Sequence, residues 1–148
     1  MKQVRDLVKG HKVVTVGKAA TVQMAAEIMA RENVGALAVV EEGLLVGIFS
    51  ERDVISRVVC KQHDPMKTSV GSVMTRNIVI ALADDTVESS LSKMKAAKCR
   101  HLPVVDGDIL LGMLSLRDLL QMVVLETEGK IEFLQNYMFH LPPAETGG

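Results

Sequence analysis

The sequence predicts an α/β (α+β) fold built from two similar halves, each with the element order β-α-β-β-α. The segment GIFSERD at residues 47–53 returns 65 residues later as GMLSLRD at residues 112–118. Other identities follow at the same spacing, among them Thr21 with Thr86 and Met29 with Met94. A chain that repeats itself over most of its length is predicted to hold two copies of one structural unit.

The sequence of the first half predicts five secondary-structure elements. Its apolar residues recur at helical spacing after Thr21, which can cap a helix, and continuous apolar runs on either side of a Glu-Glu-Gly turn suit buried strands. A second helix begins after Ser50. The expected elements are an extended piece at 13–16, a helix at 21–33, strands at 36–40 and 44–49, and a helix at 51–60.

The second half repeats this pattern. We expect a helix at 86–98, strands at 102–105 and 109–114, and a last helix opened by Ser115. The two halves are predicted to join through a linker at 63–68. Apolar residues at helical spacing further predict a C-terminal helix over residues 127–141, followed by a frayed tail at 142–148.

Composition narrows the class of protein. The 148 residues are 48% hydrophobic but only 3% aromatic, so the core must be aliphatic. A unit of about 60 residues buries too little surface to be very stable alone, which favours one core shared by both halves. The net charge of −1, without a basic block, argues against a nucleic-acid partner. No apolar run has membrane-spanning length and no signal peptide is visible, so we expect no membrane partner and a cytoplasmic location.

The repeated corner between strand and helix has two interpretations. Ser50 with Asp53, and Ser115 with Asp118, have the spacing of capping boxes, which would simply begin a helix. The alternative is a ligand site. It rests on the arginine that follows each serine by two residues, because a cation at the positive end of a helix dipole is unfavourable unless an anion is there.

On the ligand interpretation, Arg52 and Arg117 bind phosphate together with the free amides at the helix start. Asp53 and Asp118 then accept hydrogen bonds from ribose hydroxyls, as acidic residues do in other nucleotide-binding folds.

The two corner motifs, together with VMT at residues 73–75 and HLPVVD at residues 101–106, resemble a tandem pair of CBS domains, also called a Bateman module. The resemblance covers residues 4–62 as a first repeat and 68–126 as a second. It implies two units around a pseudo-twofold axis, with a cleft on each side that binds an adenosine-containing molecule. It further implies a regulatory protein rather than an enzyme, which forms a homodimer and acts on a regulated protein that the sequence does not name.

The same resemblance implies contacts for the base of the ligand. The Asp118 cleft would use Val13, Val14, Val34 and Gly35, and the Asp53 cleft would use Ile78, Val79, Cys99 and Arg100. His101 is either a further phosphate contact or simply a partly buried residue before a strand.

Three functions remain open: a sensor of AMP, ADP or ATP, with NAD or S-adenosylmethionine as alternative ligands; a scaffold with empty clefts; and an enzyme acting on nucleotides. The enzyme is the weakest, because the four histidines are scattered, no Gly-rich phosphate loop is present and no motif positions a nucleophile or base.

Overall fold

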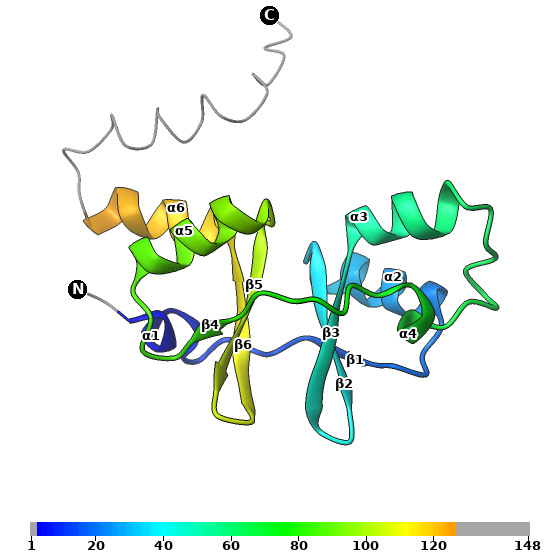
Figure 1. Cartoon of the computed structure of the whole chain (residues 1–148), viewed down its shortest axis with the longest axis horizontal. Coiled ribbons are helices and arrows are strands. Elements are labelled where there is room, and N and C mark those ends of the chain that lie inside the picture. Colours follow the sequence, from blue (N-terminus) through cyan, green and yellow to red (C-terminus); the bar gives the residue numbers. More distant parts are fainter. Residues whose placement is uncertain (1–2, 127–148) are drawn as a thin grey trace, which may run out of the picture.

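The structure of the protein is a computed structural model that describes residues 3–126 (Figure 1). The first half contains α1 (Val4–Val8), β1 (Thr15–Gly17), α2 (Val22–Glu32), β2 (Ala36–Glu41), β3 (Leu44–Ser50), α3 (Glu51–Asp53) and the π-helix η1 (Val54–Val59). The second half contains α4 (Val70–Val73), β4 (Ala81–Leu82), α5 (Val87–Ala97), β5 (His101–Asp106), β6 (Ile109–Ser115) and α6 (Leu116–Glu126). The predicted α/β class and internal repeat are confirmed. The helix expected at 127–141 and the tail at 142–148 lie outside the described residues.

Two three-stranded sheets with the same topology form the centre of the molecule. The strand orders are β1-β2-β3 and β4-β5-β6, and in each sheet a parallel pair is followed by an antiparallel hairpin. Both hairpins shift register at the same place, between Val39 and Val40 and between Val104 and Val105. The sheets contact each other through β3 and β6, so the start of each closing helix lies near the boundary between the halves (Figure 1).

The two long helices α2 and α5 begin and end alike. The hydroxyl oxygens of Thr21 and Thr86 accept hydrogen bonds from the backbone amides of Met24 and Ser89, each at 3.1 Å, which is the N-cap predicted from the sequence. Both helices end on a residue with left-handed backbone geometry, Asn33 in one case and Lys98 in the other.

The short helices α1 and α4 are exchanged between the halves. In Figure 1, α1 lies beside β6 of the second half, whereas α4 lies beside β3 of the first. The exchange explains two repeated glycines. A β-carbon at Gly112 would lie 2.8 Å from Cβ of Val8, and one at Gly47 would lie 2.7 Å from Sδ of Met74. Both glycines are therefore required by a neighbouring helix that packs closely on the strand.

Buried side chains form two clusters, one in each half, where a single shared core was expected. The first cluster is built around Phe49 and Leu37 and includes Val70 and Val73 of α4. The second is built around Leu91, Leu102, Leu114 and Leu119 and includes Val4 and Val8 of α1. Each cluster thus takes a helix from the other half, and this exchange replaces the expected common core as the feature that makes the halves depend on one another.

The closing helix of the first half is not a regular α-helix. The amides of Cys60 and His63 donate to the carbonyl oxygens five residues earlier, those of Ile55 and Val58, at 2.9 and 3.0 Å. Its counterpart α6 is a continuous α-helix. The expected plain helix at 51–60 is therefore wrong in type, although its position is correct.

Candidate ligand-binding clefts

Both corner serines begin a helix at the end of a strand. Ser50 ends β3 and its hydroxyl oxygen accepts from the Asp53 amide at 3.4 Å; Ser115 ends β6 and accepts from the Asp118 amide at 3.0 Å. At Ser50 the reciprocal bond also forms, because the Asp53 carboxylate accepts from the Ser50 amide at 3.0 Å. The first corner is therefore a complete capping box.

The Asp53 carboxylate is buried and fully engaged. Its side chain is 7% exposed, and it accepts from the Ser50 hydroxyl at 3.2 Å and from the Thr75 hydroxyl at 3.1 Å. The guanidinium of Arg57 lies 3.5 Å from the same carboxylate and also donates to the Met74 carbonyl oxygen at 2.9 Å. Thr75 and Arg57 tie this corner to the segment that follows α4. Neither was assigned a role from the sequence, although Thr75 lies in the VMT motif.

The Asp118 carboxylate has a different environment. Asp118 is exposed, and within residues 3–126 its carboxylate accepts no hydrogen bond and forms no ion pair. The cause lies in two replaced neighbours. Met122 stands where the first half has Arg57, and Lys9 stands where it has Thr75, since Val8 and Met74 occupy equivalent positions against their glycines. The two corners share a motif, but only the second leaves its carboxylate available.

Arg52 and Arg117 are both exposed in the first turn of their helices. In the part of the chain that the structure describes, neither forms an ion pair with a carboxylate. Both guanidinium groups are thus available to an anion, as the ligand interpretation of the motif requires.

A cavity of about 140 Å³ lies beside the Asp53 corner, and most of the residues predicted for this cleft line it. The lining residues are Ile48, Thr75, Asn77, Ile78, Val79, Ala97, Cys99, His101 and Pro103. Arg100 is not among them; it is exposed, and its carbonyl oxygen accepts from the Leu116 amide at 2.8 Å. The cavity is smaller than the roughly 300–1,000 Å³ typical of small-molecule sites.

The residues predicted for the Asp118 cleft all lie in the first half, and only Gly35 is seen to contact the second. Val13, Val14, Val34 and Gly35 are all partly buried, and Val14 and Val34 pack against the first core cluster. Gly35 faces the second half directly, because a β-carbon there would lie 3.3 Å from the His101 imidazole.

His101 stands between the two clefts. Burial lowers the pKa of its imidazole, the negative charges of Glu51 and Asp118 act in the opposite direction, and the positive charge of Arg100 lowers it further. The pKa of His101 therefore depends on charged groups at both corners. Burial also raises the pKa of the nearby Cys99 thiol, opposed by hydrogen bonds to backbone groups, and a raised pKa disfavours a nucleophilic thiolate.

Within residues 3–126, no group of three or more histidine, cysteine or acidic side chains is placed to hold a metal ion. Nor is any helix in that range long and apolar enough to cross a bilayer. The two corners therefore share one motif and differ in their carboxylates, that of Asp53 being buried and that of Asp118 exposed.

Sequence comparison decides the family. The profile of the CBS domain matches residues 4–60 and 70–125. The chain belongs to the CBS-domain family. The CBS domain-containing protein YhcV of Bacillus subtilis is 35% identical over 119 residues, which cover 80% of this chain and 84% of that protein. The meiotically up-regulated gene 70 protein of Schizosaccharomyces pombe is 43% identical over 102 residues, or 68% of this chain, but the match spans only 14% of its length.

Solved CBS structures share the fold. A protein with CBS domains from Burkholderia ambifaria superposes with a TM-score of 0.80 at 30% identity, covering 88% of this chain and 99% of that one. A CBS-domain protein from Pyrobaculum aerophilum, solved with AMP, gives 0.75 at 25% identity over 84% and 97% of the two chains. The CBS pair of protein MJ0100, solved with 5′-methylthioadenosine and S-adenosyl-L-methionine, gives 0.76 at 26% identity over 86% and 99%. The chain is thus a CBS pair with the fold of these structures.

Proposed function

We propose that this CBS pair senses an adenosine-containing ligand and that the Asp118 corner is its principal site. The observation that carries the proposal is the difference between the two carboxylates. Asp118 is exposed with an unengaged carboxylate, whereas the Asp53 carboxylate is buried and held by Ser50, Thr75 and Arg57. A ribose can bind Asp118 without first breaking a hydrogen bond within residues 3–126.

The remaining groups around Asp118 suit the other parts of a nucleotide. Its carboxylate would accept from the two ribose hydroxyls, and the exposed guanidinium of Arg117 would bind phosphate. The partly buried side chains of Val13, Val14 and Val34, beside Gly35, offer an apolar face for the base. Because the site offers contacts for a base, a ribose and a phosphate, we favour AMP, ADP or ATP as its ligand.

The Asp53 cleft is proposed as a weaker second site. A ribose there must displace the Thr75 hydroxyl or the Ser50 amide from the carboxylate, and the adjoining cavity must widen beyond about 140 Å³. Occupation of this cleft would therefore move the segment after α4. NAD and S-adenosylmethionine remain alternative ligands, because each also carries an adenosine ribose, and complexes of related CBS proteins contain AMP or S-adenosylmethionine.

The test is a titration of the whole chain with AMP, ATP, NAD and S-adenosylmethionine by calorimetry. Asp118→Asn should weaken binding of the preferred ligand by about 10- to 100-fold, because a hydrogen-bonding carboxylate contributes about 1.5–3 kcal/mol. Asp108→Asn, an exposed carboxylate in the β5–β6 turn, is the matched control and should leave affinity unchanged. Binding to Asp118→Asn at wild-type strength would assign the corner a purely structural role.

A second candidate, a scaffold that acts through self-association with empty clefts, rests on a different observation. Ile55 and Val59 of η1 and Val124 of α6 are 60%, 65% and 39% exposed, a set of apolar side chains that a partner surface would cover. The absence of binding for all four ligands, combined with a stable homodimer, would favour this function. In the principal proposal the protein also forms a homodimer. The ligand changes the conformation of that dimer, and the dimer acts on the regulated protein.

A further inference from the structure

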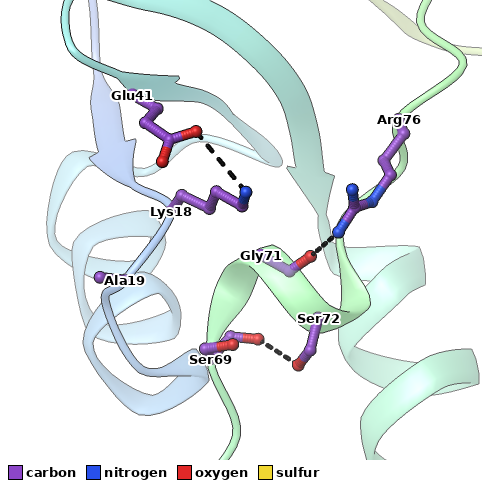
Figure 2. Close-up of a pocket in the computed structure, with 7 residues that line it drawn as sticks. All are labelled: Lys18, Ala19, Glu41, Ser69, Gly71, Ser72 and Arg76. Carbon is purple, nitrogen blue, oxygen red and sulfur yellow. Dashed lines mark hydrogen bonds and ion pairs between the residues drawn. The ribbon is translucent and has the colours of Figure 1, made fainter.

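A second cavity lies in the first half, where β1 ends and α4 begins, and none of its lining residues belongs to the corners or to the Asp53 cleft. Its volume is about 550 Å³. Figure 2 shows the lysine and the arginine on opposite sides of the α4 backbone, with two serines below it. The lining residues are Lys18, Ala19, Glu41, Ser69, Gly71, Ser72 and Arg76.

The internal repeat supplies a counterpart with which to compare this pocket. The Gly71 amide donates to the Lys18 carbonyl oxygen at 2.9 Å, and the Arg5 amide donates in the same way to that of Ala83 at 3.1 Å. Gly71 and Arg5 are therefore equivalent positions, as are Lys18 and Ala83.

In the second half the chain itself supplies two carboxylates to the cation at the equivalent place. The Arg5 guanidinium lies 2.6 Å from Asp84 and 3.7 Å from Asp106. The hydrogen bond and charge of Asp84 come first among the groups that raise the pKa of Arg5, followed by the charge of Asp106. These two aspartates correspond to Ala19 and Glu41 of the first half.

In the first half the same place is open and positive. Gly71 has no side chain, and Lys18 has moved over it, since a β-carbon at Gly71 would lie 2.4 Å from Cγ of Lys18. Lys18 reaches Glu41 only at 3.5 Å, and Ala19 offers no second carboxylate.

Arg76 adds a cation that the second half lacks, because Gly10 occupies its position there. Its guanidinium donates to the Gly71 carbonyl oxygen at 2.9 Å, which fixes its direction, and no carboxylate among residues 3–126 pairs with it. Lys18, Arg76 and Glu41 together leave one net positive charge in the pocket. The Ser69 hydroxyl makes no hydrogen bond to the described residues and can donate to an anion.

We propose that this pocket binds the phosphate group of a small molecule. Arg76 presents a planar fork of donors on a fixed side chain, the geometry that phosphate oxygens bind best, and Lys18 supplies a second charge across the pocket. The volume exceeds that of a phosphate ion and falls within the range of small-molecule sites, so the phosphate carries an organic group. The site is separate from the adenosine clefts and does not rest on the function proposed for them.

The experiment is a titration of the isotope-labelled full chain, followed by amide chemical shifts at fixed ionic strength. Inorganic phosphate and glycerol 1-phosphate are the two probes, because neither carries a ribose for the aspartate corners. We expect saturable shifts at residues 69–76 and around Lys18, with glycerol 1-phosphate binding more tightly than inorganic phosphate. Equal saturable binding of both probes would support a phosphate site but overturn the inference that the phosphate carries an organic group.

Two pairs of variants test the geometry. Ala19→Asp places beside Lys18 a carboxylate like the one that Asp84 supplies in the second half, and it should abolish saturable phosphate binding. Ala19→Asn, which has the shape of aspartate without its charge, should retain that binding. Arg76→Gln should weaken binding at least ten-fold, while Lys95→Gln, which removes one charge from the exposed side of α5, should change it less than two-fold. Shifts that sodium chloride reproduces, or that persist in Ala19→Asp and Arg76→Gln, would overturn the proposal.

Discussion

The imidazole of His101 in the second half lies directly against Gly35 in the first. A β-carbon at position 35 would be 3.3 Å from both Cε1 and Nε2 of the ring and 3.5 Å from a carboxylate oxygen of Glu51. The pseudo-twofold axis does not repeat this contact, because the equivalent positions hold Arg100 and Ala36. The boundary between the halves is therefore asymmetric at this contact.

Gly35→Ala should strain this contact. The added methyl group is closer to the imidazole than ordinary packing allows, so we expect a loss of about 1 kcal/mol in the free energy of unfolding. His101→Ala, which gives position 101 the residue of its counterpart, should remove the strain. A double-mutant cycle by chemical denaturation measures the coupling, and strictly additive effects of the two changes would contradict the contact.

The stability of the protein should depend on the protonation of His101. Burial, with the charge of Arg100, lowers its folded-state pKa against the opposing charges of Glu51 and Asp118, so the unfolded chain binds a proton more readily. The free energy of unfolding should be constant above about pH 6.5, the pKa of an unperturbed histidine, and fall as the pH decreases below it. Thermal melts from pH 7.5 to 5.0 test this.

His101→Gln should flatten that pH profile, since it removes the titrating group. His63→Gln, at an exposed histidine between the halves, is the matched control and should leave the slope unchanged. A slope that persists in His101→Gln would assign the effect to other residues.

The two corner aspartates should differ in what they do for the fold. Asp53→Asn removes the charge that binds Thr75, Arg57 and the Ser50 amide, and should cost about 1.5–3 kcal/mol in the free energy of unfolding. Asp118→Asn loses only a favourable interaction with the helix dipole, worth about 0.3–1 kcal/mol. Urea denaturation of both variants measures the difference. Equal losses would mean that the Asp53 network adds no stability.

This difference between the corners marks how far the sequence alone could predict the site. The repeat of 65 residues located both serines, both arginines and both aspartates, and helical and strand periodicity located the longer elements but not the short helices α1 and α4. Identical motifs could not reveal that one carboxylate is buried and the other exposed. That outcome depends on Thr75 and Arg57, which reach Asp53 from other elements and have no counterparts near Asp118.

The exchange of α1 and α4 between the halves could not be predicted from the sequence for a related reason. Each short helix begins the repeat to which its sequence belongs, so an alignment of the halves assigns it there. Its packing partner is set by a close approach at Gly47 or Gly112, which involves residues more than 25 positions away. The π-helix was equally invisible, because apolar periodicity over six residues does not distinguish it from an α-helix.

Ser90→Ala should stabilise the protein. Ser90 is completely buried in α5, and its hydroxyl has no hydrogen-bond partner among the described residues. The equivalent residue in α2 is Ala25, also completely buried. Removing an unsatisfied polar group should raise the free energy of unfolding by about 1–3 kcal/mol. Ser92→Ala, exposed on the same helix, controls for helix propensity and should gain only about 0.5 kcal/mol. A thermal melt that ranks Ser92→Ala above Ser90→Ala would contradict the assignment.

The closing helices η1 and α6 lie along one side of the molecule (Figure 1). We expect the apolar residues that these helices expose to hold a homodimer together. In water Ile55 and Val59 are 60% and 65% exposed, and burial of each against a partner contributes about 1.5–3 kcal/mol. The wild-type chain should therefore sediment at micromolar concentration as twice its mass of 16.1 kDa. Ile55→Lys with Val59→Lys should shift it to the monomer, because the charges would be desolvated at the interface. Leu44→Lys, at a position on the β2–β3 hairpin that is 51% exposed, should remain dimeric. A wild-type chain that sediments only at 16.1 kDa would contradict the homodimer, and the exposed apolar residues of these helices would then be a surface for a different protein.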